Sequence, residues 1–218
     1  MSYSPESVQT LLHSSDYGDR LQGINQLRQL DPALAFTMIQ PLVIDTNARV
    51  RYAAVSQLDP LGKQDLDKAL DLLQERLLYD SEADVKAAAA DAIGGLKLVA
   101  AYDHLETLYY QTSDWLIQLS IIATLGELGE PRGFDLLLHA LNSDNTLVKT
   151  AAVSALGELG DTRAISSLVP LVGDEDWQVR YRLAQSMGRL GGEQARAILA
   201  QLSQDPVEQV AREAKDNL

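Results

Sequence analysis

Apolar residues recur along this chain with a helical period, and the whole pattern repeats about every 31 residues. The segments that begin at Leu116, Leu147 and Gln178 align without gaps at this spacing. Stepping both ways from Val179 finds seven equivalent anchor positions: Asp19, Val50, Val85, Ile117, Val148, Val179 and Val210. Internal repetition at a nearly constant step is typical of an array of stacked helical repeats.

Each copy carries an apolar stripe that continues four and eight residues after its anchor, as in Val148, Ala152 and Leu156. This spacing places the three side chains on one face of a helix. A second amphipathic segment follows each stripe, so each copy is predicted to be a helix–turn–helix unit. A helix near Pro5–His13, capped by Ser4, is expected to complete the first unit. The chain is therefore predicted to be an all-α solenoid of about seven hairpins.

Polar residues and glycines mark the ends of these helices. Glycines follow the stripe where a chain leaves a helix in the left-handed conformation, at Gly129, Gly160 and Gly191. Five residues before each anchor stands a short side chain with an oxygen, which predicts a helix N-cap. These predicted caps are Ser14, Asp45, Asp80, Thr112, Ser143, Asp174 and Asp205.

One step is longer than the others, since 35 residues separate Val50 from Val85. The extra residues fall around Pro60–Gln64, where we expect a longer outer helix or loop. No linker or low-complexity tract interrupts the array, which predicts one domain over residues 1–218.

Composition and charge narrow the possible partners. The formal net charge of −13 disfavours nucleic acid and anionic membranes, which would be repelled. No apolar run is long enough to span a membrane, and the N-terminus lacks the features of a secretory signal, so a cytoplasmic protein is expected. The chain has no cysteine, which excludes disulfides, thiolate metal sites and cysteine nucleophiles. The oligomeric state is left open.

A basic column lies one residue after the anchors. It comprises Arg20, Arg51, Lys86, Lys149 and Arg180. These cations could form a positive strip for an acidic partner. We favour a structural ladder, in which they bind the aspartates that start the copies and so tie neighbouring repeats together.

The sixth copy departs from the pattern of the others. Arg182 stands three residues after its anchor, where other copies have Ala53, Ala88, Ser120 and Ala151. Trp177, Arg180 and Tyr181 lie beside it in the sequence, and Trp, Tyr and Arg dominate binding hot spots. Arginine also clamps carboxylates. The alternative is an exposed, charged helix end with Trp177 as packing filler.

Aromatic residues recur on the inner helices. Tyr52 is equivalent to Tyr181, two residues after the anchor, and Trp115 to Trp177, two before it. Both positions lie opposite the apolar stripe, on the concave side of a solenoid, so these rings are expected to line a groove. Stiffening of the stack is the alternative. The candidate binding set is Trp177, Arg180, Tyr181, Arg182, Tyr52 and Trp115.

Catalysis has little support in the sequence. His13, His104 and His139 lie far apart and lack metal-ligand spacing. No nucleophile-elbow or phosphate-binding motif is found. We therefore predict no catalytic residue and no metal site, and enzymatic activity is an open but disfavoured alternative.

The order Asp, Val-Arg, Ala and Leu-Gly-x-Leu-Gly-Asp resembles a HEAT repeat over essentially the whole chain. Units near 31 residues are shorter than ordinary HEAT units. They are similar to those of cyanobacterial phycobilin lyase subunits and of the NblB group of phycobilisome-degradation proteins.

The resemblance implies a cytoplasmic protein with phycobiliprotein subunits, such as phycocyanin, as partners. It also implies a bilin as a transient ligand, whose propionates arginine could bind, and no permanent cofactor. Three functions stay open. They are a binding factor that promotes phycobilisome disassembly and degradation, a bilin lyase subunit that acts with a partner, and a generic protein-interaction scaffold.

Overall fold

The structure is a computed structural model that describes residues 4–218, and it is almost entirely helical. This range holds fourteen α-helices and no strand, which confirms the prediction of an all-α chain of helical hairpins. The chain divides into two compact units, Met1–Ser120 and Ile121–Leu218, which we call the N-terminal and C-terminal units. The boundary falls inside helix α8 (Trp115–Leu128), and the prediction of a single domain stays a prediction.

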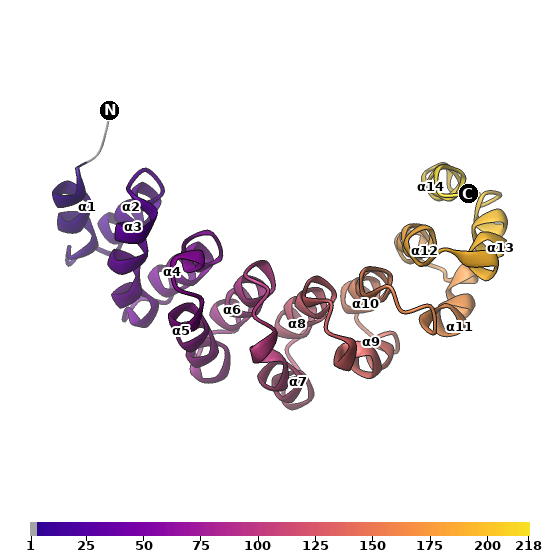
Figure 1. Cartoon of the computed structure of the whole chain (residues 1–218), viewed down its shortest axis with the longest axis horizontal. Helices are drawn as coiled ribbons and strands as arrows, with labels where there is room; N and C mark the ends of the chain where they lie inside the picture. Colours follow the sequence, from indigo (N-terminus) through magenta and orange to yellow (C-terminus); the bar gives the residue numbers. More distant parts are fainter. Residues whose placement is uncertain (1–3) are drawn as a thin grey trace. The chain divides into compact units, whose positions relative to one another are not determined.

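The N-terminal unit consists of helical hairpins stacked in sequence order. Its helices before α8 are α1 (Pro5–Leu12), α2 (Tyr17–Leu27), α3 (Pro32–Ile39), η1 (Gln40–Ile44), α4 (Ala48–Leu61), η2 (Gly62–Gln64), α5 (Leu66–Tyr79), α6 (Ala83–Gly95), η3 (Val99–Ala101) and α7 (Tyr102–Gln111). Helices α2, α4 and α6 pack in one row and α5 and α7 in another (Figure 1).

The C-terminal unit repeats this arrangement. After α8 come η4 (Pro131–Gly133), α9 (Phe134–Ala140), α10 (Thr146–Leu159), α11 (Ala164–Leu168), η5 (Val169–Gly173), α12 (Trp177–Leu190), α13 (Gly192–Leu202) and α14 (Glu208–Asp216). Helix α12 packs against both α10 and α14 (Figure 1). We call the even-numbered helices, which carry the anchors, the inner helices.

The apolar stripe forms the core between neighbouring hairpins. The anchors Val50, Val148, Val179 and Val210 are fully buried. Burying a side chain of this size contributes about 1.5–3 kcal/mol relative to leaving it in water. One hairpin cannot bury its own stripe, so the stability of each hairpin depends on its neighbours.

Small residues allow neighbouring inner helices to approach closely. A methyl group added at Gly157 on α10 would lie 2.8 Å from the Cα of Ser186 on α12, so nothing larger than glycine fits without movement. The Ser186 hydroxyl donates to the Val153 carbonyl across this contact, at 2.7 Å. Gly129, Gly160 and Gly191 have φ values of +64°, +74° and +65°, as their predicted left-handed positions require.

The predicted cap residues lie about one turn before the first residue of the helices that they were expected to cap. Every inner helix from α2 to α14 begins three residues after the predicted cap residue. The side-chain oxygen at each predicted position instead accepts the backbone N–H two residues later, as Asp45 does from Asn47 at 2.8 Å. The helix cap itself is the residue at that later position: Asn47 caps α4 and Asp176 caps α12. The sequence interpretation missed this because both positions favour the same short polar side chains.

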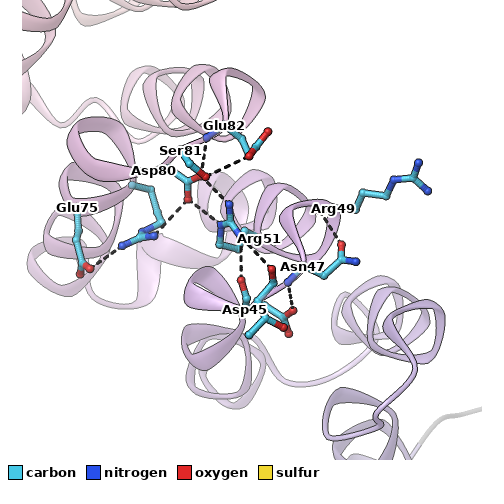
Figure 2. Close-up of polar contacts among 10 residues, drawn as sticks. Asp45, Asn47, Arg49, Arg51, Glu75, Asp80, Ser81 and Glu82 are labelled. Atoms are coloured by element: carbon cyan, nitrogen blue, oxygen red, sulfur yellow. Dashed lines mark hydrogen bonds and ion pairs between the residues drawn. The ribbon is translucent and has the colours of Figure 1, made fainter.

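The basic column forms a ladder between repeats, as predicted. Arg51 Nη1 donates to the Asp45 carbonyl of its own copy at 3.0 Å, and its Nε and Nη2 donate to the Asp80 carboxylate of the next copy at 2.8 and 2.9 Å (Figure 2). Arg20 pairs in the same way with Asp45. Lys86 reaches only the Leu78 carbonyl, at 3.1 Å, because Thr112 stands where the next aspartate would be.

The insertion after α4 lengthens an outer helix, as expected. Helix α4 continues to Leu61, through Pro60, and η2 follows. Helix α5 then runs for 14 residues, whereas the outer helices α9 and α11 have 7 and 5.

Replacement of Asp80 should destabilise the protein more than replacement of Asp174. The Asp80 side chain is 1% exposed and accepts from both Arg51 and Arg76, so Asp80→Asn removes the ion-pair partner of Arg51 and leaves Arg76 with Glu75 alone. We expect a loss of about 3 kcal/mol. Asp174 meets Lys149 at a longer 3.5 Å, so Asp174→Asn should cost about 1 kcal/mol. Urea unfolding of both variants measures the difference, and equal midpoints would show that the buried Asp80 cluster does not stabilise its repeats.

Candidate functional site

The inner helices present a groove in each unit, and the same repeat positions line both. In the C-terminal unit a hollow of about 370 Å³ is lined by Leu147, Thr150, Trp177, Gln178, Tyr181, Arg182 and Gln209. In the N-terminal unit a hollow of about 400 Å³ is lined by Ala48, Arg49, Tyr52, Glu82, Asp84, Val85, Ala87, Ala88, Asp91, Leu116 and Ser120. Most of these residues stand one or two positions before an anchor, or two or three after it. That register explains why the grooves lie on the face opposite the apolar stripe.

Three of the predicted site residues meet in the C-terminal groove. The rings of Trp177 and Tyr181 pack edge to face, with centroids 6.4 Å apart. The guanidinium carbon of Arg182 lies 5.8 Å from the centre of the Tyr181 ring. Trp177 is 41% exposed and Arg182 is also exposed, so this cluster presents both a flat aromatic surface and a cation to solvent.

The polar ends of this cluster are held by neighbours that the sequence interpretation did not identify. Arg182 Nη1 donates to Gln185 Oε1 at 2.7 Å, and Gln185 Nε2 donates to the Tyr181 hydroxyl at 3.3 Å. The hydrogen bond between Tyr181 and Glu213 raises the pKa of the Tyr181 hydroxyl above its usual value. Gln185 lies four residues after Tyr181 on the same helix, a spacing that could have revealed it in the sequence. Glu213 comes from the next inner helix, which only the packing brings near.

Arg180 belongs to the ladder and not to this surface. Its Nε and Nη2 donate to Asp205 at 2.6 and 3.0 Å, and its Nη1 donates to the Asp174 carbonyl at 2.6 Å. Its side chain is 11% exposed. A guanidinium with this many internal acceptors connects neighbouring repeats and is not free to bind a partner, so we leave Arg180 out of the proposed binding surface.

The remaining two predicted residues belong to the N-terminal unit. Tyr52 is 48% exposed and lines the groove of that unit. Trp115 is 45% exposed at the first turn of α8. It is not among the lining residues of that groove, although its neighbour Leu116 is. Tyr52 and Trp115 therefore do not join the Trp177 cluster within one compact unit.

The two grooves differ in charge. Arg182 is the charged member of the C-terminal lining. In the N-terminal lining the carboxylates of Glu82, Asp84 and Asp91 outnumber the guanidinium of Arg49. The aromatic positions in the sequence do not point to these acidic residues. They stand three residues before the anchor Val85, one residue before it and six residues after it.

Residues 4–218 contain no group of three or more His, Cys, Asp or Glu side chains arranged to hold a metal ion. Within the same range, no helix combines the length and the apolar character needed to cross a bilayer.

Comparison with protein families identifies the repeat. A family model described as HEAT repeats matches residues 4–94, 70–156 and 134–218, which together span nearly the whole chain. The chain belongs to the HEAT-repeat family. HEAT repeats are protein-interaction modules, so a protein partner is expected.

Solved structures share this HEAT fold at low sequence identity. YibA of Escherichia coli is 16% identical, with a TM-score of 0.68 over 98% of this chain and 80% of its own. The structure of the complex of CpcE and CpcF of phycocyanin lyase from Nostoc sp. PCC7120 is 19% identical, with a TM-score of 0.65 over 100% and 96%. A mutant of Kap121p is 18% identical, with a TM-score of 0.69 over 85% of this chain and 23% of its own. A search of curated protein sequences finds no match.

The ladder makes the stability of the C-terminal unit depend on pH. The hydrogen bonds from Arg180 hold the pKa of Asp205 below its usual value, so Asp205 stabilises the fold while it is ionised. That contribution is complete above the pKa of the unfolded state, about 3.9, and is lost as the pH falls through the lower pKa of the folded state.

We therefore expect the difference in unfolding free energy between wild type and Asp205→Asn to be largest near neutral pH. It should shrink as the pH falls below about 4, because protonated Asp205 is as neutral as asparagine. Denaturant unfolding across this range measures the difference. A difference that does not change with pH would contradict the assignment.

Proposed function

We propose that this chain is a docking protein that binds phycobiliprotein subunits through the C-terminal groove, centred on Trp177, Tyr181 and Arg182. The observation that carries the proposal is the packed aromatic pair with an exposed arginine beside a hollow of about 370 Å³. Trp, Tyr and Arg together provide the aromatic area and the charged anchor that are typical of binding hot spots.

Arg182 is the residue best placed to recognise a carboxylate. Its contacts are with the neutral amide of Gln185 and with the ring of Tyr181, and within residues 4–218 no acidic side chain forms an ion pair with it. Arg180, two positions earlier, is already bound to Asp205. A planar guanidinium can take a carboxylate through two parallel hydrogen bonds, whether the carboxylate belongs to a protein or to a bilin propionate.

Two features support phycobiliproteins as the partner class. The short repeats resemble those of phycobilin lyase subunits and of the NblB group, and the structure from the phycocyanin lyase complex matches this chain over nearly the full length of both. In the role we favour, the chain engages bilin-bearing subunits in the cytoplasm and promotes phycobilisome disassembly and degradation. The bilin would be a transient ligand and not a resident cofactor.

A bilin lyase subunit is the second candidate, and the same full-length match favours it. Lyase chemistry forms or breaks a thioether bond between a bilin and a cysteine. This chain has no cysteine, so that thiol would belong to the substrate subunit. A partner chain would complete the active site.

One experiment separates these functions. Purified protein is mixed with phycocyanin, and the visible spectrum and co-elution on gel filtration are followed. Co-elution with bleaching or a spectral shift supports a pigment-directed role. Covalent transfer of free bilin to an apo-subunit would identify a lyase. No spectral change and no co-elution would leave a protein-interaction scaffold with a different partner.

Arg182→Ala should weaken binding to phycocyanin by about 2 kcal/mol or more. The thermal midpoint should change little, because three other copies carry alanine at this position. Titration calorimetry and thermal melts of both proteins measure these two quantities. Arg196→Ala is the matched control, since Arg196 is an exposed arginine on α13 that is absent from the groove lining.

Equal loss of affinity in the two variants would mean that general charge, and not the groove, attracts the partner. Unchanged affinity in Arg182→Ala would remove Arg182 from the site. Unchanged affinity with a large fall in melting temperature would make Arg182 a structural residue.

A further inference from the structure

The N-terminal groove is longer than its main hollow. A second hollow of about 180 Å³ is lined by Tyr52, Ser56, Asp59, Ala88, Asp91 and Ala92. It shares Tyr52, Ala88 and Asp91 with the larger hollow of about 400 Å³. The two hollows therefore form one trough, which runs along α4 and α6 and reaches Leu116 and Ser120 on α8.

Small side chains on α6 leave the space that makes this trough. Ala87 occupies the position that holds Tyr52 and Tyr181 in the second and sixth copies, and Ala88 the position that holds Arg182. Both alanines are buried, and both line the trough. An elongated trough with a floor of alanine leaves room for an extended chain whose side chains reach the walls.

The walls of the trough are acidic. The carboxylates of Glu82, Asp84, Asp91 and Asp59 line its two hollows, against the guanidinium of Arg49. Within residues 4–218 no hydrogen bond or ion pair engages the carboxylate of Asp84. The ring of Tyr52 adds an exposed π-face on the α4 side. An aromatic ring beside several carboxylates is a favourable environment for a cation.

Asp91 is the carboxylate that lines both hollows of the trough. Its side chain accepts a hydrogen bond from the Ser120 hydroxyl. The residue as a whole is exposed, but partial desolvation of its carboxyl raises the pKa, and that hydrogen bond only partly offsets the effect. A partner cation would reverse the penalty, because an opposite charge nearby stabilises the ionised carboxylate.

We propose that this trough binds a basic peptide segment of a protein partner, with a lysine or arginine side chain against Tyr52 and beside the carboxylates of Asp84 and Asp91. The charge of the lining selects a basic segment over an acidic one. The proposal goes beyond the phycobiliprotein assignment and does not depend on it, since it concerns different residues in the other unit and a ligand of opposite charge.

The test uses the full chain and a defined probe, the peptide acetyl-Lys-Gly-Arg-Gly-Lys-amide, with acetyl-Glu-Gly-Glu-Gly-Glu-amide as the counterpart. Amide chemical shifts of isotope-labelled protein report both affinity and location. We expect the basic peptide to shift resonances of α4, α6 and the start of α8, and the acidic peptide to shift none of them. Raising the salt concentration should weaken binding, because the contact is largely electrostatic.

Matched variants separate the trough from the overall negative charge. The double variant Asp84→Asn/Asp91→Asn should weaken peptide binding about tenfold. Asp67→Asn/Asp71→Asn removes the same charge from exposed positions of α5 and should change the affinity less than about twofold. Tyr52→Ala should cost about threefold, and Tyr79→Ala, whose ring is 77% exposed on α5, should cost nothing measurable.

Three outcomes would overturn the proposal. Equal weakening by the trough and α5 variants would show that the net charge alone attracts the peptide. Absence of binding, or shifts that map away from the trough, would show that it is not a peptide site. Binding of butylamine as tight as that of the peptide would identify a small-amine site instead. If the double variant does not fold, its own amide spectrum will show this. The comparison of Tyr52→Ala with Tyr79→Ala would then decide whether the trough binds the peptide.

Discussion

The whole structure depends on an apolar stripe that a single hairpin cannot bury. Val148, Val179 and the other apolar anchors lose their contact with water only when the neighbouring hairpin packs against them. Burial therefore stabilises pairs of neighbours, and it restricts the residues that can occupy the contact between them. Gly157 lies so close to Ser186 that no side chain fits there, which sets the spacing of α10 and α12.

The ladder of arginine–aspartate contacts helps to set the register in which neighbouring repeats pack. Burial of apolar surface has no preferred direction, whereas a guanidinium that binds a carbonyl of its own copy and a carboxylate of the next helps to fix their register. Arg51 and Arg180 make both contacts with good geometry. In the fourth copy Gln118 keeps only the carbonyl contact, and in the third copy Lys86 binds the Leu78 carbonyl of α5 instead, because no aspartate follows either residue. The inner helix of the fourth copy is α8, in which the boundary between the two units falls.

Function has room to vary on the opposite face of the inner helices. Positions two and three residues after the anchor point away from the stripe, so they can hold alanine, tyrosine or arginine without disturbing the core. Ala87 and Ala88 line the N-terminal trough, whereas Tyr181 and Arg182 give the C-terminal groove an aromatic and cationic lining. One repeat architecture thus presents two surfaces of opposite charge.

The sequence by itself determined the repeat, the fourteen helices, the left-handed glycines and the ladder, because each depends on residues close together in the chain or on the 31-residue period. It also identified Trp177, Tyr181 and Arg182 as exceptional. It placed the helix caps too early in the chain, since aspartate, asparagine and serine are favoured both in the turn before a helix and at the cap itself. Tertiary structure alone decided that Arg180 forms an ion pair with Asp205 while Arg182 stays exposed. It also decided that Asp84 and Asp91 line the same trough as Tyr52. Those outcomes depend on which side chains of neighbouring helices meet, and the distance between helices is set by packing that no single repeat encodes.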